Sequence, residues 1–280
     1  MEPFENWLLK RTINNRYGTT ISKLVPNHYQ YPRRTIRKVE RDGIKYKLDL
    51  SDLVDWYIYF GFKDLSKKSL FDKINPGDVI FDIGANMGDL SFNFSKLVGN
   101  KGHVYSFEPD AGNFERLVIN CNLNKFQNIT LIQKGVGNNP GFYKMEANEY
   151  EPGNDGSKRI VSTAIDNNSK MNDLAEIVSL DTWVEANNPE KIDLIKMDIE
   201  GYEYSAIQSA EKTLAQYSPT LYMELHDVKL KEHGSSASEL CKLVEGFGYT
   251  IFDADSNAPY GDFDSLVDIH DDIVCFKLKK

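Results

Sequence analysis

A short apolar segment that runs directly into a glycine-rich turn constrains this chain more than any other feature. Residues 78–83 have the composition of a buried strand, and they lead into Asp82–Gly88 (DIGANMG), which precedes an amphipathic stretch. Glycine adopts backbone conformations that other residues avoid, so such a turn can bring its backbone close to a ligand. In open α/β sheets, ligands bind beyond the carboxyl ends of the strands. The segment therefore predicts an α/β fold with a ligand site at this turn.

Apolar runs alternate with amphipathic stretches along the rest of the chain. Strands are predicted at 103–107, 129–133, 193–197 and 220–225, and helices at about 88–98, 111–124, 202–217 and 236–247. This alternation indicates parallel strands joined by crossovers, which is a doubly wound sheet. Two late strands, 249–252 and 272–277, have no helix between them, which indicates a terminal antiparallel hairpin.

The first third of the chain has a different pattern. Residues 35–39 and 44–48 alternate in polarity on either side of Asp42-Gly43, which predicts a β-hairpin. We therefore divide the chain into an N-terminal extension with a hairpin, residues 1–70, and a larger domain, residues 71–280. The polar stretch 148–170 is predicted to be a long loop over one end of the sheet.

Composition excludes several classes of function. The net charge of −9 and the pI of about 5.2 argue against a nucleic-acid binder, which needs basic surface. No apolar run approaches the roughly 20 residues that span a membrane, and the N-terminus lacks the pattern of a secretory signal. Three widely spaced cysteines match neither a disulfide framework nor a zinc site. We expect free thiols and a cytoplasmic location.

The turn and the next strand together suggest the type of ligand. Asn86 replaces the second glycine of the dinucleotide fingerprint, so a pyrophosphate is not the expected ligand. Asp82 at the head of the turn suits a cationic ligand that carries an ammonium group and a sulfonium. Glu108-Pro109 ends the next strand, where a carboxylate can accept hydrogen bonds from both hydroxyls of a ribose. The alternative is that Gly84 and Gly88 only relieve strain in the turn.

These motifs resemble those of the FkbM-type methyltransferases. The resemblance is carried by Asp82–Gly88, by Phe107-Glu108-Pro109, by Val178–Trp183 and by Asp193–Glu203, and it covers about residues 35–280. It implies a seven-stranded Rossmann-like methyltransferase sheet and an S-adenosylmethionine cofactor. Members of the family commonly O-methylate sugars, polysaccharides or other natural products, so the resemblance implies a sugar or glycoconjugate hydroxyl as acceptor. The residues predicted to bind the cofactor are Asp82, Gly84, Asn86, Gly88, Glu108 and Pro109.

Methyl transfer to an alcohol needs a group that takes the hydroxyl proton, a metal ion, or both. Side chains alternate along a strand, so Lys196, Asp198 and Glu200 point to one side, and Glu224 and His226 share a face of the following strand. We predict that Asp198, His226 and Lys196 are catalytic. Asp198, Glu200 and Glu224 are candidate ligands for Mg²⁺ or Mn²⁺.

Other interpretations remain open from the sequence. The acceptor could be a peptide, a lipid or a polyketide, and the fold could serve as a non-catalytic binding module. An NAD-dependent oxidoreductase is disfavoured by Asn86. The aromatic residues Tyr57, Tyr59, Phe60 and Phe62 suit packing, with binding of a sugar as a second role. Residues 1–34 and 148–170 are expected to influence acceptor choice rather than cofactor binding; the expected partner is a small-molecule or glycan acceptor, and the oligomeric state stays open.

Overall fold

The computed structural model describes residues 25–62, 67–146, 158–162 and 174–277. The predicted extension 1–34 therefore falls within the described residues only from residue 25 onward. Of the predicted loop 148–170, residues 158–162 are described and the rest lies outside the described residues.

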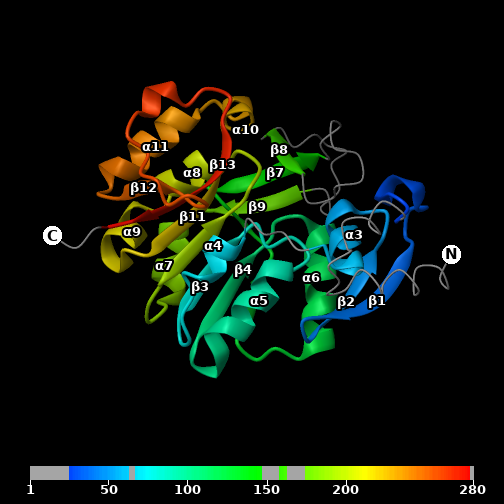
Figure 1. The fold of residues 1–280 in the computed structure, drawn as a ribbon. Coiled ribbons are helices and arrows are strands. Elements are labelled where there is room, and N and C mark those ends of the chain that lie inside the picture. Colours follow the sequence, from blue (N-terminus) through cyan, green and yellow to red (C-terminus); the bar gives the residue numbers. More distant parts are fainter. Residues whose placement is uncertain (1–24, 63–66, 147–157, 163–173, 278–280) are drawn as a thin grey trace.

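A seven-stranded sheet forms the centre of the molecule (Figure 1). Its strands are, in spatial order, β12 (Thr250–Asp253), β13 (His270–Phe276), β11 (Thr220–His226), β10 (Leu194–Met197), β3 (Val79–Ile83), β4 (His103–Phe107) and β5 (Ile129–Ile132). Strands β11, β10, β3, β4 and β5 pair in parallel, and β13 runs antiparallel to both β11 and β12. The predicted doubly wound sheet with a terminal antiparallel pair is confirmed.

The direction in which successive strands are added to the sheet reverses between β3 and β10, because β4 and β5 lie on one side of β3 and the later strands lie on the other. Such a switch point leaves a crevice outside the carboxyl ends of the two central strands. The turn after β3 and the segment after β10 therefore face one another at this edge of the sheet.

Helices cover both faces of the sheet (Figure 1). On one face, α4 (Lys68–Phe71) and α5 (Asp89–Val98) pack on the strand residues Ile80, Val104, Leu194, Tyr222 and Val274. On the other face, α7 (Leu180–Asn187), α8 (Glu203–Gln208), α9 (Glu211–Tyr217) and α11 (Ala237–Gly246) cover Phe81, Ile195, Leu221 and Cys275. Adjacent residues of each strand thus face opposite layers, as the strand period requires. The central strands are buried on both faces, which explains their continuous apolar sequences.

The helix predicted at 202–217 is two helices, because the helical conformation is interrupted at Ser209, between α8 and α9. The Ser209 hydroxyl accepts a hydrogen bond from the Leu180 N–H at 3.1 Å, and its carbonyl accepts one from the Asp181 N–H at 2.9 Å. Asp181 in turn accepts the N–H groups of Lys212 and Thr213 at 2.9 and 2.8 Å. The break therefore lets Ser209, the C-cap of α8, accept N–H groups from the first turn of α7, while Asp181 of α7 caps the first turn of α9. Helical periodicity does not reveal this long-range arrangement.

An N-terminal layer packs beside α5 and α6 (Ala111–Asn124). It contains β1 (Ile36–Arg41) and β2 (Ile44–Asp49), which form the predicted hairpin, followed by α3 (Leu53–Phe60). The Asn120 side-chain oxygen of α6 accepts the Lys47 N–H at 2.8 Å, which ties β2 to the domain. Val25 and Tyr31 are buried in the same apolar cluster as Phe92 of α5. Residues on both sides of position 70 thus share one core.

A second, smaller sheet lies near the carboxyl edge of the first. Its order is β6 (Gly135–Val136), β9 (Leu174–Val178), β7 (Gly141–Glu146) and β8 (Arg159–Ser162). The prediction of a loop throughout 148–170 is wrong at 159–162, because this segment pairs with β7 as a strand. The remaining short elements are η2 (His28–Gln30), η3 (Gly99–Lys101), α10 (Asp227–Glu232) and η6 (Phe263–Ser265). Among the described residues, no helix is long and apolar enough to cross a membrane.

Candidate functional site

Two pockets open at the carboxyl edge of the sheet and meet at Gly84, Asn86 and Asp198, which line both. We name them by a charged residue that lines each one. The Glu108 pocket lies toward β4, β5 and the small sheet, and it has an empty volume of about 590 Å³, including its open mouth. The Lys67 pocket lies toward α3 and is larger, about 1630 Å³ measured in the same way. The reversal of strand order between β3 and β10 places this junction where the fold predicts a ligand.

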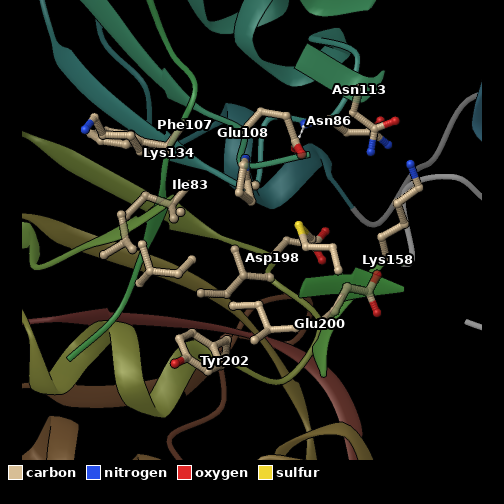
Figure 2. Close-up of a pocket in the computed structure, with 18 residues that line it drawn as sticks. Ile83, Asn86, Phe107, Glu108, Asn113, Lys134, Lys158, Asp198, Glu200 and Tyr202 are labelled. Atoms are coloured by element: carbon tan, nitrogen blue, oxygen red, sulfur yellow. Dashed lines mark hydrogen bonds between the residues drawn. The ribbon is translucent and has the colours of Figure 1, made fainter. Parts of the chain in front are cut away.

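Glu108 is held by the backbone on both sides of its carboxylate. Its Oε2 accepts the Asn86 N–H at 2.8 Å (Figure 2), and its Oε1 accepts the Asp110 N–H at 2.9 Å. Burial raises the pKa of Glu108 to about 7, although both backbone hydrogen bonds act to lower it. Each oxygen keeps a lone pair for a hydrogen bond from a ligand. Glu108 therefore fixes the turn after β3 and offers a bidentate acceptor, with Pro109 also on the pocket wall.

Asn86 occupies a left-handed backbone conformation, with φ of 49°. This conformation is unusual outside glycine, and asparagine is one of the residues that tolerate it. The Asn86 side-chain oxygen is buried and accepts no hydrogen bond from the described residues. A buried acceptor without a partner is costly unless a ligand or water satisfies it. Because Asn86 lines both pockets, a bound molecule can supply the missing donor.

Asp82 and Lys196 form a buried ion pair behind the junction. The Lys196 ammonium lies 3.2 Å from Asp82 Oδ1 and donates to the Gly84 carbonyl at 2.9 Å, while the Ser91 hydroxyl donates to Asp82 Oδ2 at 2.5 Å. Lys196 reaches the wall of the Lys67 pocket, but Asp82 is not among the described residues that line either pocket. Burial acts to lower the pKa of Lys196, but the charges of Asp82 and Asp198 outweigh it and hold this pKa above its ordinary value. Lys196 therefore stays protonated near neutral pH.

The two glycines of the turn are required by their neighbours. A Cβ on Gly84 would lie 2.0 Å from the Asp198 carbonyl oxygen, so the turns after β3 and β10 touch at this point. A Cβ on Gly88 would lie 2.3 Å from Cζ of Phe92 and 2.6 Å from Cδ1 of Leu117. Both glycines also have positive φ, 84° and 102°. Close packing of the protein on itself accounts for both positions, and Gly84 additionally lines both pockets.

Asp198 lies just beyond the end of β10, at the junction of the pockets. Burial acts to raise its pKa, but the charges of Lys196, Lys67 and Lys229 outweigh this and hold the pKa of Asp198 below its usual range. Its carboxylate is therefore ionised near neutral pH. Figure 2 shows Asp198 and Glu200 on the side of the Glu108 pocket that faces Glu108.

A lysine holds two of the three carboxylates that the sequence suggested as metal ligands. The Lys229 ammonium lies 2.6 Å from Glu200 Oε2 and 3.4 Å from Glu224 Oε2. Glu224 also meets His270 Nε2 at 2.9 Å, through its other oxygen. Among the described residues, no group of three or more His, Cys, Asp or Glu side chains is arranged to hold a metal ion. The structure thus places Asp198 and Glu200 on one pocket wall and joins Glu200 to Glu224 through an ammonium group.

His226 lies apart from the junction. It ends β11, and its ring stacks on that of His270 with centroids 4.2 Å apart. His226 is not among the described residues that line the two pockets.

Helix α3 and the residues after it form a wall of the Lys67 pocket. Val54, Tyr57, Ile58 and Phe62 line this wall. Tyr57 is 47% exposed, and its ring meets that of Phe62 edge to face, at 5.9 Å between centroids. Tyr59 and Phe60, which the sequence grouped with them, are buried in the core. The structure therefore divides the predicted aromatic group into two pocket residues and two core residues.

Several charged residues at the site were not predicted. Lys67 lines the pocket named after it and lies 2.8 Å from Asp272 Oδ2, and Lys134 and Lys158 line the Glu108 pocket. Lys158 pairs with Asp110 at 2.8 Å, and Lys134 pairs with Glu176. These lysines lie in polar stretches of sequence without a motif, so no local signal separates them from solvent-exposed lysines.

Comparison with known proteins identifies the family of this chain. Residues 82–251 match the model of the methyltransferase FkbM domain. The chain is 23% identical over 189 residues to the hexuronic acid methyltransferase AglP of Haloferax volcanii, covering 65% of this chain and 73% of that protein. It is 28% identical over 195 residues to the 2-O-methyltransferase NoeI of Sinorhizobium fredii, covering 64% and 75%. A solved methyltransferase FkbM from Methylobacillus flagellatus aligns with a TM-score of 0.44 and 18% identity, over 94% of this chain and 61% of the other.

Proposed function

This chain belongs to the FkbM methyltransferase family, and from that premise we propose that it is an S-adenosylmethionine-dependent O-methyltransferase acting on a sugar or glycoconjugate hydroxyl. The observation that carries the proposal is the junction of the two pockets at Asp198. Methyl transfer needs a donor and an acceptor that approach from opposite sides of the moving carbon. Two pockets that meet at one carboxylate suit this geometry.

We assign the adenosine half of the donor to the Glu108 pocket. Glu108 keeps a free lone pair on each oxygen for the two ribose hydroxyls, and the Asn86 oxygen offers a buried acceptor without a partner among the described residues. The sulfonium end of the donor would then lie at Gly84 and Asn86, where the two pockets meet. When bound, S-adenosylmethionine supplies a methyl group activated by its sulfonium charge. The ionised Asp198 carboxylate suits the neighbourhood of that cation.

Asp198 also serves the acceptor. In the proposed reaction its carboxylate would accept the hydrogen bond of the acceptor hydroxyl and take its proton. The hydroxyl oxygen would gain the methyl group as the carbon–sulfur bond of the donor breaks, and the donor would leave as a neutral thioether. Lys196, which stays protonated 3.2 Å from Asp82, supports the charge of this region without touching the reacting atoms. Asp82 then contributes by holding Lys196 and the turn, rather than by contact with the donor.

A sugar-like acceptor fits the Lys67 pocket. Carboxylates and aromatic rings are common in sugar sites, and this pocket combines Asp198 with the rings of Tyr57 and Phe62. One matched relative is named for methylation of a hexuronic acid, and the other is named a 2-O-methyltransferase. The first name supports a carbohydrate acceptor over a peptide, lipid or polyketide group, and the second supports transfer to an oxygen atom.

The test combines a search for the acceptor with a charge-removing variant. Mass spectrometry of a panel of free and lipid-linked glycans, incubated with the protein and S-adenosylmethionine, should reveal the mass gain of one methyl group. Asp198→Asn should bind the donor in calorimetry but transfer methyl groups about a hundred- to ten-thousand-fold more slowly. Asp264→Asn is the control, because Asp264 is exposed and pairs with Lys242 away from both pockets. Undiminished turnover of Asp198→Asn would contradict the proposed role of Asp198.

A further inference from the structure

Lys229 occupies a central position among the acidic residues beside the Glu108 pocket. It comes from α10, directly after β11, and its side chain is only 16% exposed. Its ammonium lies between Glu200 and Glu224, at 2.6 and 3.4 Å, and both carboxylate side chains are as sheltered as the lysine. The three residues come from the turn after β10, from β11 and from α10, so their meeting depends on the tertiary fold.

The backbone of the turn after β10 also packs against the backbone of Lys229. Glu200 and Gly201 both adopt positive φ, 59° and 93°. A Cβ on Gly201 would lie 2.4 Å from the Lys229 carbonyl oxygen, so the two segments are in close contact. Charge and packing therefore fix Glu200 relative to Lys229, and Asp198 lies two residues earlier in the same turn.

We infer that Lys229 is a positioning residue: its ammonium is the fixed cation that holds Glu200 and Glu224, where the sequence suggested a divalent metal ion. By holding Glu200, Lys229 keeps the turn that carries Asp198 in the orientation needed for methyl transfer. The effect of Lys229 on methyl transfer rests on the proposed function, whereas the role of Lys229 as the cation of this cluster does not.

The chain contains a matched control two residues away. Lys231 also bridges two carboxylates, and its ammonium lies 2.6 Å from Asp227 and 3.4 Å from Asp268. Its side chain is 49% exposed, and Lys231 is not among the described residues that line the two pockets. The two lysines thus make ion pairs of the same lengths on the same helix. They differ in burial and in their partners, because Glu200 lines the Glu108 pocket, whereas Asp227 and Asp268 are not among the described residues that line either pocket.

The first measurement is turnover. We expect Lys229→Gln to reduce kcat by about a hundredfold, as small misplacements of reacting groups do. Donor affinity in calorimetry and KM for the acceptor should change little. Lys229→Arg should recover most of the activity, because it restores the charge, and Lys231→Gln should behave as wild type.

Circular dichroism checks the fold. If Lys229→Gln does not fold, it is replaced by Glu224→Gln, which weakens the same cluster from the other side. Wild-type turnover in Lys229→Gln would overturn the inference.

The second measurement uses Mn²⁺ and needs no acceptor. Removal of the Lys229 charge leaves clustered carboxylates without their cation, so Lys229→Gln should gain a Mn²⁺ site that is detectable by electron paramagnetic resonance. Wild type and Lys231→Gln should lack that site, and wild-type turnover should survive EDTA. If wild type methylates nothing in the panel, the proposed function has failed and the Mn²⁺ titration alone decides on Lys229. A Mn²⁺ site of equal affinity in wild type and Lys229→Gln, or no gain in the variant, would overturn the inference.

Discussion

At the scale of single residues, the proposed role of Glu108 in donor binding predicts that donor affinity depends on pH. Burial raises its pKa to about 7, and the ionised form is the one that can accept two ribose hydroxyls. As pH falls through 7, Glu108 takes up a proton and loses part of its acceptor capacity. We expect the affinity for S-adenosylmethionine to fall by about tenfold between pH 8 and pH 6, with release of a proton on binding at the lower pH.

Calorimetry in buffers of different ionisation enthalpy measures both quantities. Glu108→Gln should bind more weakly and lose this pH dependence, because an amide does not titrate here. An affinity that is equally pH-dependent in the variant would assign the titration to another group.

Glu203 is a second buried acid, and it affects stability. It accepts the Ile199 N–H at 2.9 Å, and burial together with the charge of Glu224 raises the pKa of Glu203 to about 8. The folded protein holds this proton more tightly than the unfolded chain, so stability is lost as pH rises from about 4.5 to about 8. Glu203→Gln keeps the shape and removes the charge. We expect its Tm at pH 8 to exceed that of wild type by about 2–4 °C and its Tm near pH 5 to be little changed. Thermal melts at the two pH values provide the test, and a lower Tm at both would mean that the carboxyl group itself is required.

At the scale of elements, helix α3 supplies the face of the Lys67 pocket that can set acceptor preference. Tyr57 is half exposed on that face, so its ring contributes little to the core. We expect Tyr57→Ala to raise KM for a sugar acceptor by about tenfold, which corresponds to about 1.4 kcal/mol of lost contact. Donor affinity and Tm should be unchanged, and Tyr57→Phe should retain the effect of the ring.

Tyr29→Ala is the matched control, because Tyr29 is 70% exposed and is not among the described residues that line the two pockets. If both variants raised KM equally, the wall formed by α3 would have no specific role in acceptor binding.

The elements that the sequence predicted well carry local signals. Helix 111–124 is confirmed with the same bounds, and the Asp110 side chain caps it by accepting the Asn113 N–H at 2.9 Å. The central strands are confirmed to within about one residue because their apolar runs are uninterrupted. The small sheet was missed, since β6 has two residues and β8 follows a long polar stretch.

Within the candidate site, the turn after β3 and Glu108 were predictable because their residues are consecutive in motifs. The lysines were not. Lys229 and Lys231 lie in one polar helix and look alike in sequence, and only the tertiary fold places Glu200 and Glu224 beside the first of them. The ion pairs between residues of different elements are therefore the part of the site that could not be predicted from the sequence.

At the scale of the whole molecule, the N-terminal layer and the sheet domain share an apolar core. Val25 and Tyr31 lie in the cluster that also contains Met87 and Phe92, and the Trp56 indole donates to the Pro26 carbonyl at 2.8 Å. From the sequence, residues 1–34 were expected to influence the acceptor while remaining dispensable for cofactor binding. The described part of this segment, residues 25–34, contributes the buried side chains of Val25 and Tyr31 to the cluster that contains Ala85 and Met87, the neighbours of Asn86.

Removal of residues 1–34 should therefore destabilise the whole domain. Tyr31 is 4% exposed, and replacing a buried aromatic residue by alanine leaves a cavity that costs about 3 kcal/mol. We expect Tyr31→Ala to lower the free energy of unfolding in urea by about that amount, and deletion of residues 1–34 to lower it further. Because Tyr29 is exposed two residues away, Tyr29→Ala should remain within about 0.5 kcal/mol of wild type. If the deleted chain melts like wild type and binds S-adenosylmethionine with unchanged affinity, the N-terminal layer is not part of the cooperative unit. In that case the stability of the core would not depend on Val25 and Tyr31, although both are buried in it.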